Sequence, residues 1–107
     1  MRKYLIGWMR LRPGSRSEFQ AEARPFMDAT RKEPGCIFFE MPVSPIDPDV
    51  VMVVECFRGE EDHARHEASP HMVKFRDVFS RLLVESHFEQ IFGDPSASTG
   101  AMFAPVS

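Results

Sequence analysis

Two stretches of this chain are apolar on both faces of the β-strand that each is expected to form. Cys36-Ile37-Phe38-Phe39 and Val50-Val51-Met52-Val53-Val54 carry apolar side chains at successive positions, and successive side chains of a strand point to opposite sides. A sheet with one face on its helices and the other in water would alternate apolar and polar residues instead. Both faces of the predicted sheet must therefore be covered.

The remaining periodicity places helices between such strands. We expect strands over residues 3–12, 36–42, 50–58 and 85–92, the last with Phe88 and Phe92 on one side. A helix is predicted from a capping box at Ser15 and Glu18 to the stop at 33–35, with Pro25 kinking or splitting it. A short helix over 60–68 precedes another that Ser69 caps and Pro70 begins.

The resulting order is β-α-β-β-α-β, the ferredoxin-like α+β arrangement. Its helices lie on one face of the sheet, so the other face needs a further cover. A second copy of the same sheet is the simplest cover, because symmetric pairs are the commonest oligomers. We therefore expect a homodimer with two four-stranded sheets face to face, that is, a dimeric α+β barrel. One domain over residues 1–93 is expected, with a loose C-terminal tail over 94–107.

Composition excludes several classes of partner. A formal net charge of -3 and a pI near 5.8 leave no basic footprint for nucleic acid or an anionic membrane. No apolar run approaches the roughly 20 residues that span a bilayer, and no signal peptide is recognisable. Two cysteines suggest a reducing compartment, so a cytoplasmic protein is expected.

Cys36 and Cys56 are equidistant from Ile46, the centre of the loop between two predicted strands. Symmetric pairing of that hairpin would place the two cysteines directly opposite each other and Ile37 opposite Glu55. Disulfide geometry is demanding, so two reduced, buried cysteines are expected.

Acidic and imidazole side chains gather between residues 55 and 71. Glu55 lies in an otherwise apolar strand, so it needs a partner or a raised pKa; Arg10, Arg12, His66 and His71 are candidates. His63, His66 and His71 with Glu55 or Glu67 have the side-chain types of a metal site, but such spacing is common by chance, and we expect no metal. Proton transfer is favoured over metal binding, with His66, His71 and Glu55 as catalytic residues. A structural role stays open for His66 in the helix junction and for Glu55 in an ion pair near the strand end.

Aromatic side chains would form the walls of a pocket for a flat substrate. Trp8, Phe39, Phe57 and Phe75 are the candidate substrate-binding residues, although most aromatic residues in such a chain belong to the core. The sequence contains no G-x-G-x-x-G, Walker, C-x-x-C or G-x-S-x-G motif, so no cofactor is expected.

Two local elements carry a family resemblance. Glu33-Pro34-Gly35-Cys36 and His66-Glu67-Ala68-Ser69-Pro70-His71, with the strand ending Glu55-Cys56-Phe57, resemble the antibiotic biosynthesis monooxygenase family, which includes quinol monooxygenase-like proteins. The resemblance covers about residues 2–92. It implies a dimeric α+β barrel and cofactor-independent oxidation of quinols or polycyclic phenols by molecular oxygen, after the protein deprotonates a phenol.

Two departures from the family pattern narrow that expectation. Phe57 stands where the family usually has Trp, so the hydrogen bond of an indole is lost. The positions at which haem-degrading relatives have Asn and His show Gly7-Trp8 and Phe75 here, so haem degradation is not supported. Two alternatives stay open: a non-catalytic binding protein for a hydrophobic aromatic ligand, and an oxygen-independent isomerase or cyclase of the same fold.

Overall fold

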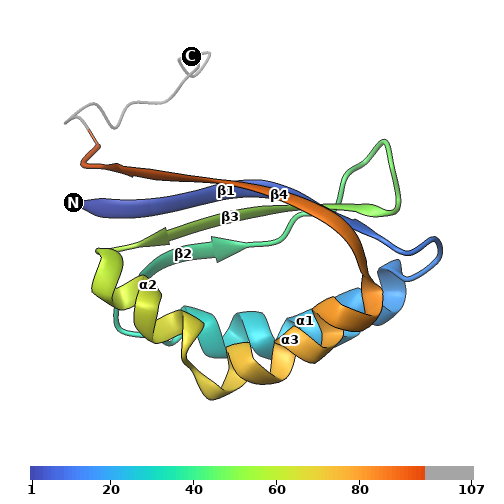
Figure 1. Cartoon of the computed structure of the whole chain (residues 1–107), viewed down its shortest axis with the longest axis horizontal. Helices are drawn as coiled ribbons and strands as arrows, with labels where there is room; N and C mark the ends of the chain where they lie inside the picture. Colours follow the sequence, from blue (N-terminus) through green and yellow to red (C-terminus); the bar gives the residue numbers. More distant parts are fainter. Residues whose placement is uncertain (96–107) are drawn as a thin grey trace, which may run out of the picture.

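A computed structural model describes residues 1–95 of the 107-residue chain, so the predicted tail falls almost wholly outside the described residues. The described part forms four strands and three helices in the predicted order, with the second helical segment divided in two (Figure 1). The elements are β1 (Arg2–Leu11), α1 (Arg16–Arg31), β2 (Cys36–Glu40), β3 (Val50–Phe57), α2 (Glu60–Glu67), α3 (Pro70–Leu82) and β4 (Leu83–Gly93).

The four strands form one antiparallel sheet in the order β2-β3-β1-β4, and all three helices lie on one side of it (Figure 1). Along β1, Leu5, Met9 and Leu11 are buried under the helices. The alternate residues point to the other side, where Ile6 and Met52 of β3 are 39% and 37% exposed. The predicted second apolar face is thus present, and nothing within the described residues covers it.

The core lies between the sheet and the helices. Phe19 and Phe26 of α1 and Phe75 of α3 are all buried, and the rings of Phe26 and Phe75 stack 4.2 Å apart. They pack over Val51 and Val53 of β3. Each such side chain contributes about 1.5–3 kcal/mol when it is removed from water, so this layer fixes both helices on the sheet.

The predicted capping box and the splitting of the first helix are both wrong. α1 begins after Ser15 as expected, but the Ser15 side chain makes no capping hydrogen bond. The helix continues unbroken through Pro25, which is exposed. On the solvent side of a helix, a carbonyl that lacks its backbone donor can bind water instead, so the proline is tolerated there.

The predicted register of the hairpin is also wrong. An irregularity between Cys36 and Phe38 shifts the pairing, so that Phe38 lies opposite Cys56 and Phe39 opposite Glu55. The extra residue in β2 leaves Cys36 opposite Phe57 rather than opposite Cys56. Both cysteines are free as expected, although Cys36 is only partly buried. Phe39, not Ile37, therefore points to the helical side beside Glu55.

β4 is longer than the predicted strand over 85–92, and its side chains alternate between the two faces in register with those of β1. Phe88 and Phe92 lie opposite Gly7 and Lys3, so both lie on one side of the sheet as expected, and that side faces the helices. No helix among residues 1–95 is long and apolar enough to cross a bilayer.

Candidate functional site

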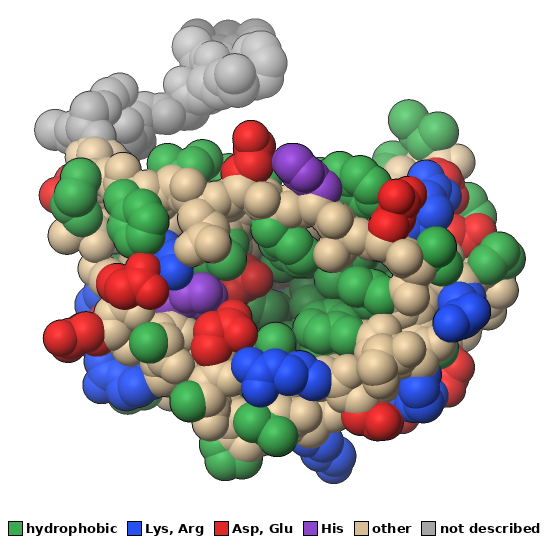
Figure 2. Space-filling model, in the orientation of Figure 1, with side chains coloured by type: hydrophobic (Ala, Val, Ile, Leu, Met, Phe, Trp, Pro, Cys, Tyr) green, Lys and Arg blue, Asp and Glu red, His purple; other side chains and the backbone are tan. Residues whose placement is uncertain are grey.

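A cavity of about 170 Å³ opens between the sheet and the helices. Figure 2 shows it as a hollow lined mainly by hydrophobic side chains. Every strand and helix of the described chain contributes to its wall, and Met41 follows β2. The lining residues are Leu5, Met9, Phe26, Phe39, Met41, Val53, Glu55, His66, Glu67, Met72, Phe79 and Phe88. Three polar residues, Glu55, His66 and Glu67, lie together in this otherwise apolar surface.

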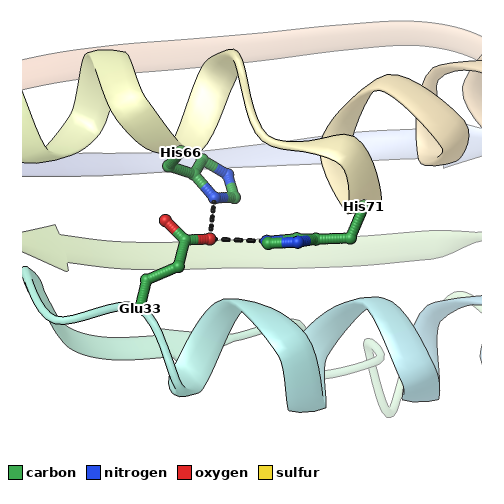
Figure 3. Close-up of side chains that lie close together, drawn as sticks. All are labelled: Glu33, His66 and His71. Carbon is green, nitrogen blue, oxygen red and sulfur yellow. Dashed lines mark hydrogen bonds and ion pairs between the residues drawn. The ribbon is translucent and has the colours of Figure 1, made fainter.

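Two imidazoles point to one oxygen of the Glu33 carboxylate (Figure 3), and one of them, that of His66, also lines the cavity. His66 Nδ1 lies 2.9 Å from Glu33 Oε2, and His71 Nε2 lies 2.6 Å from the same oxygen. A carboxylate only accepts hydrogen bonds, so Nδ1–H of His66 and Nε2–H of His71 are the donors. This fixes the tautomer of His66 and leaves its Nε2 without a proton.

The turn between α2 and α3 positions the two histidines. Ser69 caps α3 as predicted, because its Oγ accepts a hydrogen bond from Met72 N at 3.2 Å. The same hydroxyl donates to the backbone carbonyl of His66 at 2.6 Å. One serine therefore ties the end of α2 to the start of α3, and Pro70 at the first helical position needs no donor there.

Glu33 is held by the turn that follows α1. Its backbone N–H donates to Thr30 O at 3.0 Å, and its carbonyl accepts from Cys36 N at 3.1 Å. Arg58 binds the carbonyl of Pro34 through its guanidinium and that of Gly35 through its backbone. The carboxylate thus projects from a backbone that is anchored on both sides.

Glu55 is the most perturbed acid of the site. It is only 8% exposed, and its Oε1 has no hydrogen-bond partner among the described residues. The pKa of Glu55 is raised to about 8, chiefly by burial and in addition by the neighbouring carboxylates of Glu67 and Glu33. A neutral carboxyl group is therefore available at neutral pH, 4.0 Å from His66 Nε2.

Burial has the opposite effect on His66. It is 1% exposed, and loss of hydration lowers its pKa, although the hydrogen bond that its Nδ1–H donates to Glu33 raises the pKa. A neutral imidazole with a free Nε2 is a proton acceptor, and a neutral carboxyl is a hydrogen-bond donor. Together they can bind one hydroxyl group between them, take its proton and stabilise the resulting anion.

A family model for antibiotic biosynthesis monooxygenases matches residues 4–78 of the chain. The chain belongs to this family. The monooxygenase name is that of the family, and the match covers the whole cluster from Glu33 to His71.

Solved structures agree with this assignment at the level of the fold. The protein PA3566 from Pseudomonas aeruginosa is 21% identical, with a TM-score of 0.80 over 88% of this chain and 95% of its own. Rv0793 from Mycobacterium tuberculosis is 24% identical, with a TM-score of 0.80 over 92% and 100%. A structure described as an antibiotic biosynthesis monooxygenase is 19% identical, with a TM-score of 0.78 over 89% and 100%. No curated protein sequence matches the chain.

Within this member of the family, the three residues predicted to be catalytic do come together. His66 and His71 share Glu33, and Glu55 is adjacent to His66. Of the candidate partners of Glu55, Arg10 instead pairs with Asp47 and Glu85.

The four predicted substrate-binding residues are dispersed. Phe39 lines the cavity. Phe57 is fully buried against His66, with ring centroids 5.1 Å apart, and Phe75 is buried in the core. Trp8 lies on the opposite face of the sheet, where it stacks on His87. Of the four predicted residues, only Phe39 is part of the cavity wall, and Phe57 packs against the imidazole of His66.

His63 of α2 is buried. It is 7% exposed, and its Nε2 lies 3.1 Å from Glu67 Oε1 without the geometry of a hydrogen bond. The proximity of His63 lowers the pKa of the Glu67 carboxyl. This pair stands beside the Glu33 cluster and is separate from it.

Glu33 is the principal residue that the sequence interpretation did not assign to the site. It was noticed as part of the Glu33-Pro34-Gly35-Cys36 element, but without a role. The available signal was a carboxylate immediately before a Pro-Gly turn, next to a strand that runs beside Glu55. The apolar lining from Met9, Met41 and Met72 was likewise hidden among ordinary core residues.

Proposed function

We propose that this chain is a cofactor-independent monooxygenase that oxidises a quinol or a polycyclic phenol with molecular oxygen. One observation carries the proposal. His66 Nε2, which bears no proton, and Glu55 Oε1, which has no hydrogen-bond partner among the described residues, lie 4.0 Å apart in an apolar cavity. A substrate hydroxyl placed between these atoms would contact both. The family name supports oxygenase chemistry without identifying the substrate.

The proposed reaction begins with proton transfer. His66 Nε2 accepts the proton of the substrate hydroxyl, and the imidazolium that forms is stabilised by Glu33, which already binds Nδ1–H at 2.9 Å. The neutral carboxyl group of Glu55 donates a hydrogen bond to the phenolate. His71 donates to the same oxygen of Glu33 at 2.6 Å and holds that carboxylate in place.

The electron-rich phenolate then reduces oxygen directly. For a quinol, one oxygen atom enters the ring, the other leaves as water, and the substrate supplies all four electrons as it becomes a hydroxyquinone. The apolar wall excludes water from this step. A dry cavity of about 150 Å³ holds a benzene ring, so the 170 Å³ observed here favours the single ring of a quinol, with larger substrates extending past Phe88 at its edge.

Oxygen uptake with chelator-treated protein and a panel of quinols tests this proposal. We expect substrate-dependent uptake above the spontaneous rate, and a loss of 10²–10⁴-fold in kcat for His66→Gln, the usual contribution of a general base. His87→Gln is the matched control, because that histidine lies on the other face of the sheet beside Trp8. Equal turnover in the two variants, or no uptake with any quinol, contradicts the proposal. A product formed without oxygen would indicate an isomerase or cyclase instead.

We also propose that the uncovered sheet face pairs with a second copy in a homodimer. Its side chains include Tyr4, Ile6, Trp8, Phe38, Met52, Val54 and Ile91, all apolar or aromatic. Apolar side chains gathered in this number on one exposed sheet face are uncommon on a monomer. Light scattering is expected to give twice the chain mass for the wild type and a monomer for Met52→Asp. Val73→Asp, on the exposed side of α3, is the control and should stay dimeric.

A further inference from the structure

We infer that Glu33, His66 and His71 bind a divalent transition-metal ion, with Zn²⁺ as the representative case. The ligand atoms are Glu33 Oε2, His66 Nδ1 and His71 Nε2, which all lie within 4.8 Å of one another. Two imidazoles and one carboxylate form the ligand set of many zinc sites that keep a fourth position for water. The site goes beyond the proposed oxidation, which needs no metal.

The two distances from Glu33 to the imidazoles fit an ion after a small movement of the carboxylate. Zinc bonds to nitrogen and oxygen are about 2.0–2.2 Å, so tetrahedral ligand atoms stand roughly 3.4 Å apart. Glu33 Oε2 is now 2.9 Å from His66 Nδ1 and 2.6 Å from His71 Nε2. Withdrawal of the carboxylate by less than about 1 Å therefore opens the position of the ion.

One ligand is buried and held rigidly, and the other two are partly exposed and give an ion access to the site. The His66 side chain is 2% exposed, and it is tied to the α2–α3 turn by Ser69. The side chains of Glu33 and His71 are 15% and 24% exposed. An ion can thus reach the site from solvent on the His71 side, and a water molecule can complete its coordination there.

A second observation points to the same site. When His66 binds a metal through Nδ1, its remaining proton must be on Nε2, which lies 4.0 Å from Glu55 Oε1. That oxygen is a buried acceptor without a hydrogen-bond partner in the described chain, and Glu55 is 8% exposed. Metal-binding histidines commonly donate their other N–H to a carboxylate. The metal-bound tautomer would therefore provide the donor that Glu55 lacks.

The ligand set is specific to one side of His66. His63 and Glu67 form their own pair at 3.1 Å, on the other side of the imidazole. The ring centroid of His63 lies 6.1 Å from that of His66. The set differs from the sequence-based alternative built on His63, His66 and His71, because Glu33 replaces His63.

Calorimetric titration of the chelator-treated, full-length protein with Zn²⁺ tests the inference. We expect one ion per chain and a higher melting temperature in its presence, because an ion that binds only the folded state stabilises it. Glu33→Gln and His71→Asn should each weaken binding by more than the 10–100-fold that loss of an outer partner costs. Circular dichroism of each variant checks that it is folded.

His63→Gln is the matched control, since it removes a buried imidazole of α2 outside the proposed set. Its affinity for Zn²⁺ should equal that of the wild type, and Co²⁺ should give the strong visible absorption of four-coordinate cobalt in the wild type and control only. Absence of one-to-one binding, or binding that survives Glu33→Gln and His71→Asn, overturns the inference. These measurements involve no substrate, so their outcome is independent of the monooxygenase proposal.

Discussion

Replacement of Glu55 by glutamine should remove a pH dependence of stability that this one residue carries. The pKa of Glu55 is raised from its ordinary 4.5 to about 8 in the folded chain. The folded state therefore holds a proton that the unfolded state releases between these values. The stabilisation from this group is complete below about pH 4.5 and is lost as the pH rises through 8.

The expected magnitude follows from the size of the shift. The free energy of unfolding falls by about 1.4 kcal/mol for each pH unit within this window, because one pKa unit corresponds to that free energy. Between pH 5 and pH 7.5, the free energy of unfolding contributed by Glu55 should fall by about 3 kcal/mol. Glu55→Gln mimics the neutral carboxyl group and cannot ionise, so the variant should be the more stable protein near pH 7.5.

Urea unfolding of both proteins at several pH values measures this difference. Subtraction of one curve from the other cancels the common contributions, including that of His66, whose lowered pKa acts with the opposite sign. Glu22→Gln on the exposed side of α1 is the control and should track the wild type. A wild-type-minus-variant difference that changes by less than about 1 kcal/mol over this range would refute the assignment of a raised pKa to Glu55.

Three further outcomes are expected. Ser69→Ala should cost about 1 kcal/mol in urea unfolding through loss of the α3 cap, whereas Ser80→Ala, near the other end of α3, should cost less than half of that. Gly7→Ala should destabilise by at least about 2 kcal/mol because its Cβ would meet the backbone carbonyl of His87, whereas Gly93→Ala, with open space around it, should stay within about 0.5 kcal/mol. Quinol turnover should decline above about pH 8, as Glu55 ionises and loses its donor proton, in a pH–rate profile that Glu55→Gln flattens.

Much of the fold was predictable because the decisive signals were local. The Ser69-Pro70 pair predicted the start of α3, and both the cap and the helix are present. The two-sided apolar strands predicted a sheet with a second apolar face, and β1 and β3 have one. These features depend on alternation and on turn chemistry, which a single sequence displays directly.

The positions of His66, His71 and Glu55 were also predictable, since all three lie within residues 55–71 and flank one strand end. Glu33, the carboxylate that His66 and His71 share, was not predictable from the sequence. Glu33 is 33 residues from His66 in the chain, and tertiary contacts bring it there: the packing of α1 against α3 and the hydrogen bonds of Arg58 to the turn after Glu33. Periodicity indicates which face a residue occupies, but it does not indicate which two loops meet at the same end of the helices.

The cavity wall depends on a further feature that symmetry arguments miss. If β2 and β3 paired symmetrically about Ile46, Ile37 would lie beside Glu55 and the thiols would face each other. The irregularity between Cys36 and Phe38 instead places Phe39 opposite Glu55, with its ring 5.6 Å from that of His66. A bulge costs little in a strand that ends nearby, and it exchanges an aliphatic side chain for an aromatic one at the wall. That exchange puts a flat apolar surface beside the acid and the base that the proposed reaction requires.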